Sequence, residues 1–159
     1  MIMVLKKSAV TLATMLSVTS PALAQEKAVA LTGDVLLERT IVDGDGSQKT
    51  ERVAPETIVP GDRLIFTTSY TNKGGETVTD FVVTSPLPAA VRLAPDAADD
   101  LVVSVDSGKT WGPLPTLNTT AADGKTRPAT HEDVTHVRWT LASVAGGAAG
   151  TLEYPAIIR

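Results

Sequence analysis

Apolar and polar residues alternate along this chain in short runs that are separated by turn residues. One such run follows Pro60-Gly61, a pair that suits the centre of a type II turn because glycine accepts the positive φ there. In the seven residues that begin at Leu64, each position is apolar, aromatic, β-branched or a small hydroxyl residue, and Phe66 and Tyr70 share the face of Leu64. A turn followed by such a run predicts an antiparallel β-domain.

Further runs of this kind follow at the spacing expected for a β-sandwich. Residues 134–141 alternate most cleanly, with Val137, Trp139 and Leu141 on one face. The other predicted strands are residues 35–42, 49–53, 77–85, 101–105 and 151–158. Residues 94–100 and 118–133 lack this pattern, and we expect surface loops there, with residues 118–133 mobile.

The N-terminus has the pattern of a cleavable signal peptide. Lys6 and Lys7 precede an apolar and small-residue run over residues 8–20, and Ala22-Leu23-Ala24 is a small-x-small cleavage site. This run is short and rich in Thr and Ser, whereas a spanning helix needs about 20 apolar residues, so we favour cleavage over a retained membrane anchor. We predict a mature chain that begins at Gln25 and is periplasmic or secreted, with no membrane insertion after cleavage.

Composition fits one domain. The 159 residues are 43% hydrophobic, enough for one core, and twelve glycines and ten prolines favour short strands joined by turns. Because cysteine is absent, a disulfide framework, a zinc–thiolate site, a cysteine nucleophile and a lipoprotein anchor are excluded. We therefore divide the chain into a signal peptide over residues 1–24, a short lead over residues 25–33 and a β-sandwich domain over residues 34–159.

Net charge limits the classes of partner. Loss of Lys6 and Lys7 with the leader leaves 12 basic residues against 18 acidic residues, a formal net charge of −6. Nucleic acids and anionic lipids are bound by basic patches, so neither is an expected partner of this acidic chain. Solubility is the simpler explanation of the charge.

Residues 104–111 carry a specific local motif, Ser-Val-Asp-Ser-Gly-Lys-Thr-Trp. It resembles the Asp-box hairpin of sialidases and other β-propellers. In that motif we expect the Asp106 carboxylate and the Thr110 hydroxyl to bond turn amides, Gly108 to take a positive φ and Trp111 to pack underneath. One copy cannot build a propeller of at least four blades. We interpret the motif as a structural turn, with a sugar-contacting role for Trp111 as the alternative.

Metal and catalytic patterns are weak. Asp43 and Asp45 lie in an Asp-Gly-Asp-Gly turn, but an EF-hand loop from Asp43 would need glycine at its sixth position and an acid at its twelfth. Those positions hold other residues, so we expect a plain hairpin turn. His131 and His136 do not form a His-Glu-x-x-His pattern, and no Gly-x-Ser-x-Gly elbow or phosphate loop is present. We predict no enzyme, no cofactor, and no catalytic, cofactor-binding or metal residue.

Five segments occur in the order seen in the DUF11 conserved repeat family. They are Val-Pro-Gly-Asp at 59–62, Tyr-Thr-Asn-Lys-Gly-Gly at 70–75, Thr-Ser-Pro-Leu-Pro at 84–88, Ser-Val-Asp-Ser-Gly-Lys-Thr at 104–110 and Asp-Val-Thr-His-Val-Arg-Trp-Thr-Leu at 133–141. The chain resembles this family over residues 34–158. The resemblance implies an immunoglobulin-like antiparallel β-sandwich of about 7–9 strands on exported bacterial proteins, usually without assigned catalysis.

Three functions remain open from the sequence. The favoured one is a non-catalytic exported module of the cell envelope or a secreted protein, which binds a protein partner or itself through edge strands or loops. The alternative is a glycan-binding or calcium-binding module, which requires a platform near Trp111 or convergence of several aspartates. Those aspartates are Asp43, Asp45, Asp96, Asp99 and Asp100. An enzyme would require His131 or His136 within reach of a serine and a carboxylate in a cleft.

Overall fold

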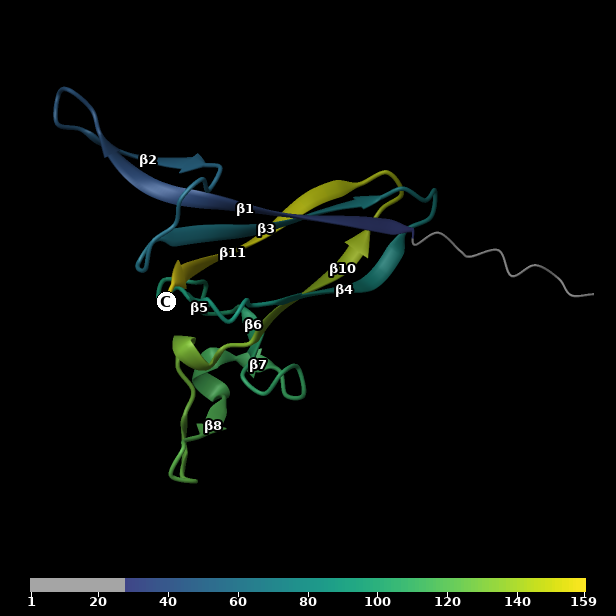
Figure 1. Ribbon diagram of the computed structural model, residues 1–159. Coiled ribbons are helices and arrows are strands. Elements are labelled where there is room, and N and C mark those ends of the chain that lie inside the picture. Colours follow the sequence, from purple (N-terminus) through teal and green to yellow (C-terminus); the bar gives the residue numbers. More distant parts are fainter. Residues whose placement is uncertain (1–27) are drawn as a thin grey trace, which may run out of the picture.

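The computed structural model describes residues 28–159, and antiparallel strands dominate them (Figure 1). The strands are β1 (Val29–Val42), β2 (Gln48–Val53), β3 (Arg63–Asn72), β4 (Val78–Pro86), β5 (Val91–Leu93), β6 (Val102–Ser104), β7 (Gly112–Pro113), β8 (Asn118–Thr120), β9 (Thr126–Pro128), β10 (His136–Val144) and β11 (Ala149–Ile158). Two 3₁₀ helices, η1 (Leu114–Thr116) and η2 (His131–Asp133), complete the list. Neither is long or apolar enough to cross a membrane, and no other helix occurs in these residues. The predicted signal peptide and its cleavage site lie outside the described residues.

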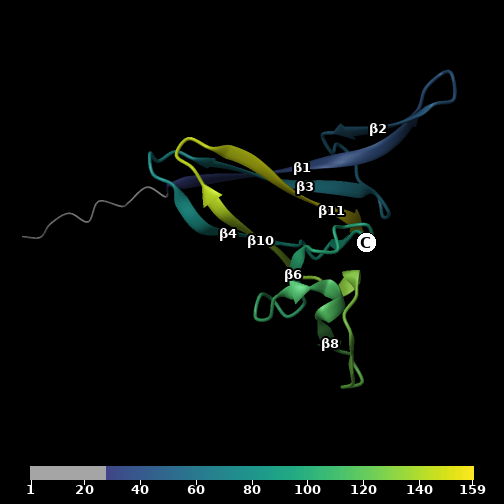
Figure 2. The ribbon, with the colours of Figure 1, turned by 180° about the vertical axis from the view of Figure 1, so that it is seen from behind.

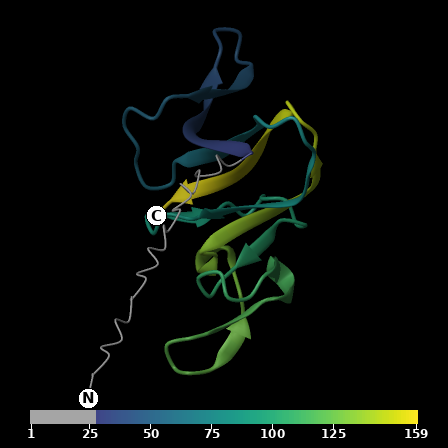
Figure 3. The same cartoon turned by 90° about the vertical axis from the view of Figure 1, so that its right-hand side faces the viewer.

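The strands form two packed sheets and one separate hairpin. The five-stranded sheet has the order β2-β1-β3-β11-β5, and the four-stranded sheet has the order β4-β10-β6-β7. Figures 1 and 2 show the two sheets as opposing layers, with the tip of the β1–β2 hairpin extending beyond them. Figure 3, turned by a quarter, shows the β8–β9 hairpin on the far side of the four-stranded sheet. The predicted all-β antiparallel architecture is confirmed.

The core lies between the two sheets and uses the alternation read from the sequence. Leu64 from β3, Val137 from β10 and Tyr154 from β11 are buried in one cluster, and Phe66 and Trp139 pack against it. The rings of Phe66 and Tyr154 stack with centroids 5.0 Å apart, an arrangement that adds to the hydrophobic gain from their burial. Side chains two residues apart on one strand thus face the opposite sheet, as predicted.

Two chain crossings hold the sheets together at one end. The β3–β4 and β10–β11 connections both lead the chain from one sheet to the other there (Figure 1). The Asn72 side chain is fully buried, and its Nδ2 donates to the carbonyls of Glu76 (2.8 Å) and Val144 (2.9 Å). Its Oδ1 accepts from the Gly74 amide at 3.0 Å. One side-chain amide therefore bonds to the β3–β4 connection and to the last residue of β10, and both its nitrogen and its oxygen have partners.

Glycine is required where the two connections touch. A Cβ placed on Gly146 would lie 2.4 Å from the carbonyl oxygen of Gly75, which is far inside van der Waals contact. The predicted turns also form: Asp62 N donates to Val59 O at 3.0 Å around Pro60-Gly61, where Gly61 has φ 94°. These glycines allow backbone geometries that a side chain would prevent.

Two sequence predictions on element boundaries were wrong, and a third was right in part. β1 begins at Val29 and pairs with β3 from its first residue, so most of the predicted lead over residues 25–33 belongs to the five-stranded sheet. The predicted surface loop 94–100 is a loop in which most residues are exposed, but Ala94 and Ala97 are buried in the core. Residues 118–133, predicted as one loop, form β8, β9 and η2.

Removal of the Asn72 amide should weaken the joint between the sheets. Asn72→Ala leaves the buried Val144 carbonyl, the part-buried Glu76 carbonyl and the Gly74 amide without this partner, so we expect a loss of about 2 kcal/mol in the free energy of unfolding. Denaturant melts of a chain that begins at the predicted cleavage site measure this loss. Asn118→Ala, at an exposed asparagine of β8, is the matched control and should leave the stability unchanged. Equal stability of both variants would show that the Asn72 contacts do not hold the joint.

Candidate functional site

The Asp-box segment forms a closed turn whose polar groups bond to one another. The Asp106 carboxylate accepts from Thr110 N (2.8 Å), Lys109 N (3.1 Å) and Ser104 Oγ (2.8 Å). Gly108 has φ 85° and donates its N–H to Ser104 Oγ at 2.9 Å. The predicted carboxylate–amide bonds and positive φ are confirmed. The Thr110 hydroxyl contributes to the lowered pKa of the Asp106 carboxyl.

These bonds lower the pKa of the Asp106 carboxyl far below its ordinary value. The Thr110 amide contributes most, followed by the Thr110 and Ser104 hydroxyls. Each donor stabilises the ionised carboxylate over the protonated acid. In the folded protein the ionised Asp106 carboxylate therefore serves to close the turn.

The Trp111 ring lies against this turn and is covered on one face. Its Nε1 donates to Gly108 O at 2.9 Å, and the Arg138 guanidinium carbon lies 3.5 Å from the ring centroid. The His136 ring approaches edge-on, with centroids 6.2 Å apart. A sugar platform needs an open aromatic face. The stacked guanidinium counts against that alternative for the covered face.

The other candidate residues are dispersed. Asp45 accepts from its neighbour Ser47, and Asp96 pairs with Arg63. Among residues 28–159, no three His, Asp or Glu side chains gather in the way that a metal site requires. His136 Nδ1 lies 3.0 Å from the Thr135 hydroxyl. Within the same residues, neither imidazole has a serine and a carboxylate as hydrogen-bond partners, so the geometry that the enzymatic alternative needs is not found.

The feature that the sequence did not reveal is an open side of the sandwich. β6 pairs with β10 only over residues 136–138, and β5 pairs with β11 only over residues 156–158. Beyond these points, β10 and β11 each have a strand edge without a neighbour, and residues of both strands line one groove. Residues 145–148 connect the two strands.

A groove of about 480 Å³ lies at this open side. Leu101, Trp139, Leu141 and Pro155 give it apolar walls. A second set of lining residues is acidic: Asp96, Asp100 and Glu153. The groove thus has apolar walls, polar lining residues and a rim of exposed acidic side chains, and it lies next to two free strand edges.

Hydrogen bonds in the neighbouring ladders show which backbone groups face the groove. Leu87 N donates to Thr135 O, so the odd-numbered residues of β10 bond to β4, and Thr140 points its N–H and C=O to the free side. Ala94 N donates to Pro155 O, so on β11 the groups of Thr151 and Glu153 point outward in the same way. Pro155 has no N–H, and an edge position is where a strand tolerates this.

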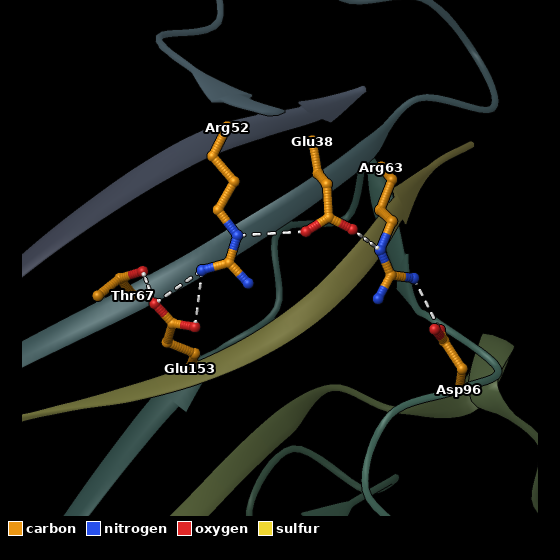
Figure 4. Close-up of polar contacts among 6 residues, drawn as sticks. All are labelled: Glu38, Arg52, Arg63, Thr67, Asp96 and Glu153. Carbon is orange, nitrogen blue, oxygen red and sulfur yellow. Dashed lines mark hydrogen bonds and ion pairs between the residues drawn. The ribbon is translucent and has the colours of Figure 1, made fainter. Parts of the chain in front are cut away.

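A network of ion pairs fixes the loop that forms one wall of the groove (Figure 4). Glu38 on β1 accepts from Arg52 Nε (3.2 Å) and Arg63 Nε (2.7 Å). Arg52 Nη1 continues to Glu153 at 3.0 Å, and Arg63 Nη1 continues to Asp96 at 2.7 Å. The Arg63 hydrogen bond is the main cause that lowers the pKa of the Asp96 carboxyl. The network joins β1, β2, β3 and β11 to the loop after β5.

The other exposed edges carry features that discourage pairing. β2 presents Lys49, Glu51 and Arg52, and charged side chains protect an edge. β4 is interrupted at Asp80, which has φ 51° and lacks a ladder partner on β10. On β1, the Asp34 carboxylate accepts a hydrogen bond from the Val35 N–H at 2.8 Å. This N–H lies on the part of the β1 edge that β2 does not cover, so it is no longer free to pair with another strand. The β10 edge has no such device.

Comparisons with known proteins were made for the whole chain. No protein-family model matches it, and no curated protein or solved structure matches it. The function must therefore be inferred from the strand edges and the groove.

The Asp106 turn should contribute to the acid sensitivity of the fold. Because folding lowers the pKa of Asp106, its contribution to stability is present above the unfolded-state pKa of about 3.9 and is lost as pH falls below it. We expect Asp106→Asn to be less stable than the wild type at pH 7 and to lose less stability between pH 5 and pH 2.

Thermal melts over this pH range test the expectation. Asp43→Asn, in the hairpin turn before β2, is the matched control. Its carboxylate accepts no hydrogen bond from residues 28–159. It should keep the pH dependence of the wild type. An unchanged slope in Asp106→Asn would show that the Asp-box bonds do not stabilise the fold.

Proposed function

We propose that this chain is a non-catalytic, exported interaction module with an immunoglobulin-like β-sandwich. It binds an extended segment of a partner polypeptide, which adds as a strand along the free edge of β10. The observation that carries the proposal is the pairing of an unprotected strand edge with an apolar groove on the open side of the sandwich.

Strand addition uses two kinds of contact, and the open side offers both. The outward N–H and C=O of Thr140 can bond to an added backbone, which gives affinity without sequence preference. Alternate side chains of the added segment would enter the slot between Leu101, Trp139 and Leu141, which gives specificity. An extended segment with apolar residues at every second position fits this site.

The family resemblance and the leader support the rest of the proposal. The DUF11-like segments over residues 59–62, 70–75, 84–88, 104–110 and 133–141 are typical of exported, non-catalytic β-sandwich domains. The signal-peptide pattern over residues 1–24 favours a periplasmic or extracellular location. In such a location, a module that reads the backbone of a partner needs neither a cofactor nor a metal.

Export predicts a defined mature terminus. When the full chain is expressed in a bacterium with a periplasm, we expect the purified protein to begin at Gln25, as measured by intact mass and N-terminal sequencing. Ala24→Lys places a charged residue at the cleavage site and should retain residues 1–24. A wild-type chain that keeps its Met1 after passage through the cell would contradict export.

The strand-addition site can be tested with peptides. Random decapeptides displayed on phage are selected on the immobilised mature chain, and the enriched peptides are synthesised and titrated into the ¹⁵N-labelled protein. We expect alternating apolar sequences and amide shifts concentrated on Thr140, Thr151 and Glu153, whose N–H groups point to the free strand edges. Shifts confined to β2 or β4, or the absence of enriched peptides, would overturn the proposal.

A groove-blocking variant adds a control. Ala98 is exposed and lines the groove, so Ala98→Trp should fill the slot without disturbing the core and weaken peptide binding at least about tenfold. Ala122→Trp makes the same change at the exposed tip between β8 and β9 and should bind normally. Both variants should melt near the wild-type temperature. Normal binding by Ala98→Trp would place the peptide elsewhere.

A further inference from the structure

Arg138 differs from every other arginine of this protein. The chain has seven arginines, and six of them lie within 4.0 Å of a carboxylate. Arg138 forms no ion pair and no side-chain hydrogen bond with any residue from 28 to 159. Its Nε is buried without a hydrogen-bond partner. A guanidinium has five N–H donors, and an unpaired buried one is costly, so this arrangement requires an explanation.

The Asp-box turn holds this guanidinium in one plane. Trp111 lies directly beneath it, with the Arg138 guanidinium carbon 3.5 Å from the ring centroid. Trp111 is in turn fixed by its bond to Gly108 O, inside a turn that Asp106 closes. Stacking shields Nε and leaves the Nη groups as the donors that a ligand can reach. The donors are thus oriented before any ligand arrives, which lowers the entropy that binding would cost.

Arg138 also lies at the strand-addition site. It lines the groove together with Trp139 and Leu141, and it is the last β10 residue that β6 covers. Because side chains alternate, Arg138 lies on the opposite face of β10 from the inward-facing Val137 and Trp139. If an added strand turns its apolar side chains into the groove, its other side chains face solvent and would therefore lie near Arg138.

We propose that Arg138, stacked on Trp111, is a carboxylate-binding subsite that pairs with an Asp or Glu side chain of the added strand. A carboxylate can accept two parallel N–H bonds from a guanidinium. The groove rim already carries Asp96, Asp100 and Glu153, so it disfavours a polyanion and admits a single charge beside Arg138. This subsite rests on the proposed function, and it adds that the partner segment has an acidic residue on its solvent face.

Two designed peptides test the subsite. The first is acetyl-Val-Thr-Val-Glu-Val-Thr-Val followed by a Gly-Lys-Lys amide tail, and the second has Gln in place of Glu. We expect the Glu peptide to bind the wild-type mature chain about tenfold more tightly than the Gln peptide. A third peptide, with Glu moved to an apolar position, should lose this advantage because its carboxylate would face the groove.

Variants and spectra assign the effect to Arg138. In Arg138→Gln the two peptides should bind equally, while Arg39→Gln, which removes the same charge from exposed β1, should keep the tenfold difference. The side-chain N–H signals of Arg138 should shift with the Glu peptide and not with the Gln peptide. Melting curves confirm that both variants are folded.

The outcomes separate this inference from the proposed function. Equal affinity of the Glu and Gln peptides for the wild type, with shifts at Thr140, would leave strand addition in place and overturn the carboxylate subsite. A preference for Glu that survives in Arg138→Gln would overturn it as well. If neither peptide binds at the groove, both the proposed function and the subsite are wrong.

Discussion

One buried amide connects the two halves of this protein. Asn72 ends β3, and its side chain bonds to the β3–β4 connection and to the last residue of β10. Both crossings between the sheets therefore meet at one end, where Gly146 lets the backbones touch. Because a buried amide without partners is strongly unfavourable, these contacts favour the relative placement of the sheets that satisfies them.

The connection of the two sheets at that end determines which strands lie along the open side of the sandwich. The β10–β11 connection carries the chain from one sheet to the other, so each strand needs a different neighbour on its outer side. Those neighbours, β6 and β5, are only three residues long. The Asp-box turn begins directly after β6, and the loop from Ala94 bends into the core directly after β5. The open edges and their groove follow from these two early strand ends.

Most of the polar contacts described above hold loops in position and do not form a reactive site. The Asp106 carboxylate and the network of Glu38, Arg52 and Arg63 bond to partners within the protein, and these bonds fix loops. Exposed ion pairs of this kind add little stability individually. Their value lies in holding the loop of Asp96 beside the groove. Arg138 stands apart because its neighbours orient it without neutralising it.

The sequence by itself determined the local structure. Period-two alternation identified β3, β10 and β11, and glycine and aspartate placed the turns at Gly61 and Asp106, because these features depend on a few adjacent residues. Short strands such as β5 escaped prediction, since three residues carry no readable period. The open edge, the groove and the solitary Arg138 were decided only by tertiary structure. The open edge and the groove depend on where strands distant in the sequence end, and the unpaired state of Arg138 depends on which carboxylates lie near it. The alternation of residues along one strand contains neither kind of information.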